Sequence, residues 1–91
     1  MSFAEAYHDF AMLIQVTPPG REAEWHNLLK KATPAPEMCV EIRSPNLVIF
    51  AIGADTEMEA QDRAEAWLLD VAAKVNPPIS LYFDAHSSHH Y

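Results

Sequence analysis

Four stretches of the chain are predicted to be β-strands: three of them place large apolar residues at alternate positions, the pattern of a strand with one buried face, and residues 47–52 are apolar throughout. The four stretches are residues 10–16, 37–43, 47–52 and 79–85. In the second of them, Met38, Val40 and Ile42 share one face, while charged or small residues occupy the other. Because Ser44-Pro45-Asn46 supplies turn residues between the second and third stretches, these two are predicted to form a hairpin.

Two further segments space their apolar residues three and four positions apart, which is typical of an amphipathic helix. In residues 21–32 the apolar stripe consists of Trp25, Leu28, Leu29 and Ala32. A second helix is predicted to begin after Thr56, because Thr56 and Glu59 have the spacing of a capping box. Its apolar stripe precedes a stop at residues 76–78 and comprises Ala60, Ala64, Trp67, Leu68, Val71 and Val75.

The order strand, helix, strand, strand, helix, strand predicts an α+β fold of the ferredoxin-like type. In this plan both helices cover one face of a four-stranded antiparallel sheet, and right-handed crossovers give the strand order 4-1-3-2. A chain of 91 residues suffices for one hydrophobic core but not for two. We therefore expect one domain over residues 10–85, an N-terminal extension over residues 1–9 and a C-terminal tail over residues 86–91. Within the extension, Ser2 and Glu5 have the spacing of a further capping box.

Composition and charge narrow the possible partners. Apolar residues make up 49% and charged residues 21% of the chain, as in globular proteins. Six basic against thirteen acidic side chains give a formal net charge of -7, which repels a phosphate backbone and argues against direct nucleic-acid binding. Cys39 is the single cysteine, so an intramolecular disulfide is impossible. No apolar run approaches the roughly 20 residues of a membrane helix, and the expectation is a cytoplasmic protein without membrane contact.

The sheet face that points away from the helices is the first candidate surface. If Phe10 and its alternates face the helices, Leu13, Leu47, Ile49 and Tyr82 point outward on neighbouring strands. An apolar cluster in this position is typical of an interface with a partner or with a second copy of the chain. Two alternatives are that a terminal segment folds back over the cluster, and that the cluster forms the floor of a small-ligand site.

An acidic stretch at the start of the second helix is the other candidate surface. Its residues are Asp55, Glu57, Glu59, Asp62 and Glu65, followed by Asp70. These six acids and the one base among them, Arg63, account for five of the seven net negative charges. Part of this charge has a structural explanation, because carboxylates favour a helix N-terminus and Glu59 can pair with Arg63. One interpretation is a solvated helix face. The other is a row of carboxylates that imitates nucleic-acid phosphates and binds a basic protein.

Familiar catalytic motifs are absent from the sequence, and we predict no cofactor and no metal site. Gly20 and Gly53 lie too far apart for a phosphate-binding loop. Cys39 falls within a predicted strand and nothing in the sequence places a histidine beside it, which favours a structural thiol. Potential metal ligands occur near the C-terminus, namely Asp84, His86, His89 and His90. Because a terminal segment without apolar anchors does not hold ligands in fixed geometry, we expect only adventitious metal binding there.

These features support two main functional hypotheses, and the terminal histidines leave a metal-binding or metal-sensing module as a third option. The first is a non-enzymatic binding module that inhibits a basic nucleic-acid-binding protein through its acidic helix. In size and acidity the chain resembles, as a class, inhibitors made by phages and mobile elements, including anti-CRISPR proteins. The alternative is a homodimer that packs two sheets face to face, as dimeric α+β barrels do, and binds or transforms a small molecule between them. Polar candidates facing that space are Gln15, Glu41, Arg43, Ser80 and Tyr82.

Overall fold

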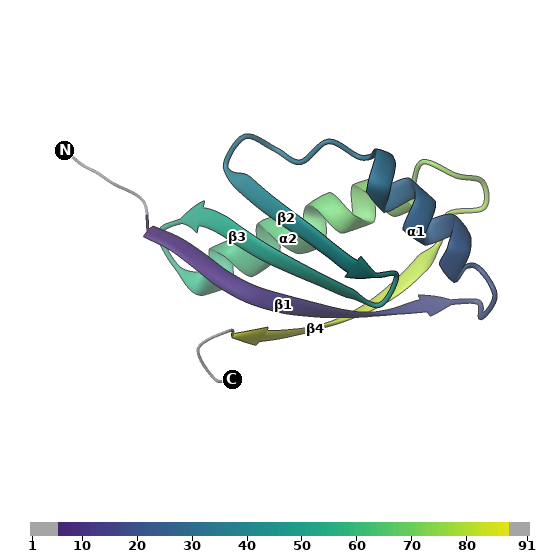
Figure 1. Cartoon of the computed structure of the whole chain (residues 1–91), viewed down its shortest axis with the longest axis horizontal. Helices are drawn as coiled ribbons and strands as arrows, with labels where there is room; N and C mark the ends of the chain where they lie inside the picture. The colour runs from purple at the N-terminus through teal and green to yellow at the C-terminus, as the bar shows by residue number, and fades with distance from the viewer. Residues whose placement is uncertain (1–5, 88–91) are drawn as a thin grey trace.

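The computed structural model describes residues 6–87, which form one antiparallel sheet and two helices (Figure 1). The elements in chain order are β1 (Ala6–Thr17), α1 (Glu22–Lys31), β2 (Met38–Ser44), β3 (Leu47–Ala54), α2 (Glu57–Ala72) and β4 (Ser80–Ser87). The strand order is β2-β3-β1-β4, with each neighbouring pair antiparallel. The ferredoxin-like arrangement and strand order predicted from the sequence are confirmed.

β1 and β4 extend beyond the strands that the sequence predicted at residues 10–16 and 79–85. β1 begins at Ala6, where it pairs with Ala54 of β3, and β4 continues alongside β1 as far as Ser87. The additional residues are mostly polar or small, but the backbone hydrogen bonds of a ladder do not require apolar side chains. Hydrophobic periodicity therefore underestimates both strands. The capping-box residues Ser2 and Glu5 lie outside the described part of the chain.

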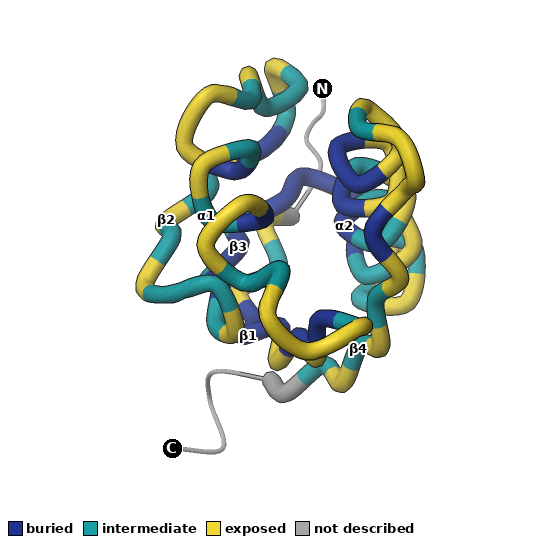
Figure 2. The backbone as a smooth tube through the Cα atoms, turned by 90° about the vertical axis from the view of Figure 1, so that its right-hand side faces the viewer, coloured by how far each residue is buried: buried dark blue, intermediate teal, exposed yellow. Residues whose placement is uncertain are grey.

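The core lies between the sheet and the helices (Figure 2). From β1 and β3 it receives the predicted alternate residues Phe10, Met12, Ile14, Val16, Val48, Phe50 and Ile52. α2 approaches the sheet through small side chains, because Ala60 and Ala64 are fully buried. The Phe10 and Phe50 rings stack with centroids 5.6 Å apart, and Trp67 meets Phe50 edge-on at 6.1 Å. Such aromatic pairs contribute about 0.5–1.5 kcal/mol each beyond their buried area, and they hold α2 against the inner face of the sheet.

Both helices pack on the core, but only α2 begins with a side-chain cap. Trp25 and Leu29 of α1 are buried in the core that α2 also covers, so both helices lie on the same face of the sheet. α2 begins with the predicted cap: the Thr56 hydroxyl accepts a hydrogen bond from the Glu59 N–H at 3.1 Å. Neither of these helices, which are those of the described residues, has the length and apolar character needed to cross a bilayer.

Candidate functional site

The one basic side chain among the acids of α2 is turned toward the body of the protein. Arg63 donates a hydrogen bond from Nη1 to the Gly53 carbonyl at 2.7 Å, and its Nη2 lies 2.8 Å from Glu59 Oε2. The other oxygen of that carboxylate accepts a hydrogen bond from the Asp55 N–H at 3.2 Å. The predicted Glu59–Arg63 pair is confirmed, and it joins the end of β3 to the first turns of α2. Arg63 is therefore engaged internally and does not neutralise the outer face of the helix.

The remaining predicted acids differ in exposure. Asp55 and Asp62 are exposed, whereas Glu57 and Glu65 are half-buried. Glu57 also accepts a hydrogen bond from Gln61 Nε2 at 3.4 Å. Of the five predicted acids, Asp55, just before α2, and Asp62, in its second turn, are thus the exposed ones, and Asp70 further along the helix is exposed as well.

A second stripe of α2, on its solvent side, was missed by the sequence reading. Met58, Asp62, Glu65 and Leu69 recur at i, i+4, i+7 and i+11, which is the spacing of one helix face. Met58 is 74% and Leu69 51% exposed, so two large apolar side chains and two carboxylates share this face. We call these four residues the outer stripe of α2. The spacing was visible in the sequence, but the longer apolar stripe that enters the core dominated the pattern.

The open face of the sheet carries all four residues predicted to form an interface there. Leu13 of β1 lies opposite Leu47 of β3, and Ile49 is the next outward residue on β3. Tyr82 of β4 pairs with Gln15 of β1, one row beyond Leu13. Leu13 and Tyr82 are 43% and 72% exposed, while Leu47 and Ile49 are half-buried. The fold therefore places these four residues on one continuous surface, and their role as an interface stays a prediction.

Two further apolar residues of β1 belong to this face. Tyr7 is 64% exposed and pairs with Gly53 near the end of β3. It escaped the sequence reading because the strand was predicted to begin at Phe10. Ala11 is only 3% exposed although it points to the open side, and it pairs directly with the larger Ile49. The centre of the open face thus combines bulky side chains with small ones.

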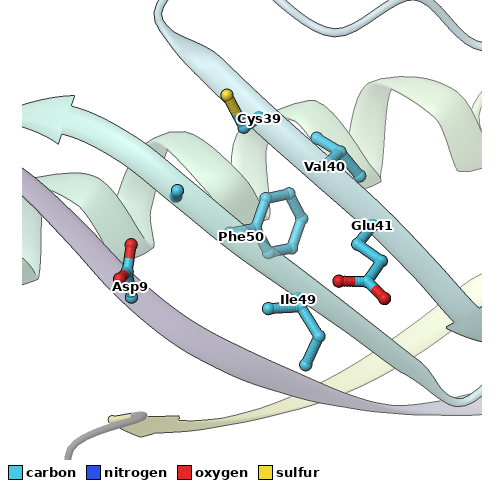
Figure 3. Close-up of a pocket in the computed structure, with 7 residues that line it drawn as sticks. Asp9, Cys39, Val40, Glu41, Ile49 and Phe50 are labelled. Atoms are coloured by element: carbon cyan, nitrogen blue, oxygen red, sulfur yellow. The ribbon is translucent and has the colours of Figure 1, made fainter.

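An open hollow of about 360 Å³ lies on the same face (Figure 3). Asp9 of β1, Ile49 of β3, and Cys39 and Glu41 of β2 are among the residues that line it. The Glu41 carboxylate is 2.6 Å from Arg43 Nε and is therefore already paired on the surface. No histidine lines the hollow in residues 6–87, so it does not supply the thiol–imidazole pair that cysteine nucleophiles use.

The histidine-rich C-terminus is only partly within the described residues. Asp84 is exposed on β4 and His86 belongs to the same strand, whereas His89 and His90 lie outside the described part. Within that part, no group of three or more histidine, cysteine, aspartate or glutamate side chains could hold a metal ion. His8 of β1 is half-buried, and its Nε2–H donates to the Ala54 carbonyl at 3.1 Å. Since a carbonyl only accepts, this contact places the ring proton on Nε2.

No protein-family model, no curated protein and no solved structure matches the chain. Inference about function therefore rests on the chemistry of two surfaces, the outer stripe of α2 and the open face of the sheet. They lie on opposite sides of the molecule, because α2 packs on one side of the sheet and the open face is the other (Figures 1 and 2).

Proposed function

We propose that this protein is a non-enzymatic binding module that places the outer stripe of α2 on a basic surface of a larger protein and inhibits nucleic-acid binding there. The proposal rests mainly on the placement of Arg63. Residues 55–70 contain six acids and this single base. Because the Arg63 guanidinium is engaged by the Gly53 carbonyl and Glu59, the exposed Asp55 and Asp62 have no basic partner within residues 55–70 of the described structure.

The spacing of the acids supports a nucleic-acid-binding partner. Asp62 and Glu65 are three residues apart on a helix, which corresponds to about 4.5 Å along its axis. The phosphates of one B-DNA strand rise by about 3.4 Å each along the duplex axis, so the axial interval between the two carboxylates is similar to, although longer than, that between successive phosphates. A groove lined with lysine and arginine for a phosphate backbone can therefore accept this row of carboxylates.

The two apolar side chains of the outer stripe add a second component to binding. Burial of Met58 and Leu69 removes apolar surface from water, which contributes affinity that does not depend on salt. The carboxylates between them set orientation and accelerate association with a positive surface. We therefore expect a partner whose basic groove contains an apolar depression.

The experiment that tests the proposal has two stages. A photo-crosslinking amino acid is placed at Leu69 and, as a matched control, at Lys30 on the exposed part of α1, and both versions are used to capture proteins from extracts of the producing cell. We expect the version with the crosslinker at position 69 to capture a partner protein and the version with the crosslinker at position 30 not to do so. The captured protein is then purified and its affinity is measured for the wild type, for Asp62→Lys with Glu65→Lys, and for Glu24→Lys as the control.

We expect the double charge reversal to weaken binding by roughly tenfold or more, while Glu24→Lys changes it little. Raising the salt concentration should slow association with the wild type, and a DNA fragment should compete with the protein for its partner. A partner that is captured equally from both positions, or that is indifferent to the charge reversal and to salt, would exclude this function.

A further inference from the structure

The open face of the sheet is complementary to itself about a line that runs between β1 and β3. Across these two strands, a larger residue on one is opposite a smaller residue on the other in three successive rows. The rows are Tyr7 with Gly53, Asp9 with Ala51, and Ala11 with Ile49. A two-fold axis parallel to the strands would set β1 of one copy over β3 of the second, row by row. Ile49 of each copy would then lie over Ala11 of the other.

The outer strands extend this complementarity to charge. Leu13 pairs with Asp84 on β4, and Leu47 pairs with Ser44 at the end of β2, next to the surface residue Arg43. The register shift between Ile42 and Ser44 places Arg43, which is paired with Glu41 in one copy, beside this row, so a basic residue lies at its β2 end, two leucines at its centre and an acidic residue at its β4 end. The same two-fold axis exchanges β2 with β4, so Arg43 of each copy faces Asp84 of the other and the leucines meet in the centre. An axis across the strands would instead set β2 over β2 and lose this match.

We propose that the open sheet face is the interface of a homodimer with its two-fold axis parallel to the strands, between β1 and β3. With strands about 4.8 Å apart, of which β1 covers rows 7–15, β3 rows 7–13, β2 rows 8–13 and β4 rows 10–15, the face is roughly 450 Å² in projection. The accessible area of such a corrugated surface is larger than its projection and is comparable to the roughly 800 Å² per partner of ordinary specific interfaces. We expect a reversible dimer with a dissociation constant of about 1–100 µM, at the weak end of the range that interfaces of ordinary size cover.

The same two-fold arrangement also gives the exposed Tyr82 ring a surface to contact on the second copy. Tyr82 of β4 pairs with Gln15 of β1, one row beyond the row that contains Leu13. On the β2 side of the sheet, the position one row beyond Leu47 is the hairpin turn that contains Pro45, and the two-fold axis would bring Tyr82 over this turn. This turn is held rigidly, because the Asn46 side chain donates to the Ile14 carbonyl at 2.9 Å and the Asn46 carbonyl accepts from the Ile14 N–H at 2.9 Å. The exposed ring of Tyr82 would therefore rest on a fixed loop of the second copy.

Charge exchange provides the test. Sedimentation velocity is measured from about 1 µM to about 500 µM for the wild type, Arg43→Glu and Asp84→Arg, with Lys30→Glu on α1 as the control for a charge reversal away from the sheet. In a dimer of either interface variant, two like-charged contacts replace two opposite-charged ones. Each is expected to raise the dissociation constant by roughly tenfold at low salt. Lys30→Glu should leave it unchanged.

Mixing the two interface variants is the decisive step. In a mixed dimer, the glutamate of R43E meets the arginine of D84R, while the native Asp84 and Arg43 form the second contact. Both contacts are then attractive, so the mixture should dimerise about as tightly as the wild type although neither variant does so alone. A general loss of stability could not produce this rescue.

Three results would overturn the proposal: a wild type that is monomeric over the whole range, interface variants that behave like Lys30→Glu, or a mixture no tighter than its components. Binding of a terminal segment of the same chain over the face would give the first of these. Should an interface variant fail to fold, the wild-type concentration series together with Leu13→Lys decides the question. Because the outer stripe of α2 lies on the opposite side of the sheet, none of these results alters the proposed function.

Discussion

Burial and hydrogen bonding conflict most strongly at Trp25. Its side chain is completely buried, yet its indole N–H has no hydrogen-bond acceptor among the described residues. An unsatisfied buried donor costs about 1–3 kcal/mol. Full burial of a large apolar side chain contributes about 1.5–3 kcal/mol or more, so burial of the Trp25 ring at least offsets the cost of its unsatisfied indole N–H. Trp67, in contrast, donates from Nε1 to the Thr33 carbonyl at 3.3 Å.

Trp25→Phe should therefore cost little stability, because it removes the orphaned N–H together with part of the ring. We expect the free energy of unfolding to fall by less than about 1.5 kcal/mol, against about 3–5 kcal/mol for Trp25→Ala, which leaves a cavity. Urea unfolding monitored by circular dichroism measures both changes. Equal losses for the two substitutions would mean that the indole N–H contributes to stability after all.

At the scale of the element, α2 has one face built for close approach and another built for contact with solvent. Ala60, Ala64 and Ala72 are buried against the sheet, whereas Met58 and Leu69 project outward. Interiors are packed nearly as densely as organic crystals, so a methyl group at Ala64 sets the distance between helix and sheet. The acids of the first turns are compatible with the helix because its N-terminus favours negative charge.

Ala64→Leu should destabilise the protein because three extra carbon atoms would have to enter this contact. We expect a loss of about 1–3 kcal/mol in the free energy of unfolding. Ala66→Leu is the matched control, since Ala66 lies on the same helix but is exposed, and its change should stay within about 0.5 kcal/mol. If both substitutions had the same effect, the helix would not be packed on the sheet at Ala64.

At the scale of the whole molecule, the fold places two surfaces of different charge on opposite sides of the sheet. The sheet lies between the acidic helix and the open face, so a basic partner and a second copy of the chain could bind at the same time (Figure 2). The charges of the open face include both signs, with Arg43 beside Glu41 at 2.6 Å, whereas the charged residues of the outer stripe of α2 are both acids. Self-association through α2 would bring like charges together, and self-association through the sheet would not.

Dimerisation through the sheet predicts a melting temperature that depends on protein concentration. Above the dissociation constant, a tenfold rise in concentration should raise Tm of the wild type by about 3–5 °C. Leu13→Lys should abolish this dependence with little change at low concentration, because Leu13 is already 43% exposed in one copy. Leu69→Lys, at a similarly exposed position on α2, should keep the wild-type dependence. Differential scanning calorimetry over a concentration series measures all three proteins, and an unchanged dependence in Leu13→Lys would contradict the proposed interface.

Much of the fold could be predicted because its signals are local. Alternation at Met38, Val40 and Ile42 identifies an inward strand face, and the Thr56 hydroxyl caps a helix four positions from the first buried alanine. The ends of β1 and β4 could not be predicted, since their pairing depends on strands distant in sequence. The outer stripe of α2 was overlooked because periodicity alone does not tell which of two apolar stripes enters a core.

The sequence alone determined the order of the elements, the acidity of α2 and the residues with alternating or helical spacing, because each depends on neighbours a few positions away. Tertiary structure decided which charges act outward and which surfaces are complementary. In the sequence Arg63 is one base among acids, and only the fold brings Gly53 to it; Arg43 and Asp84, 41 positions apart, come to opposite ends of the Leu47–Leu13 row only through strand register. Contacts of this kind depend on how the backbone pairs across the sheet, which local periodicity does not encode.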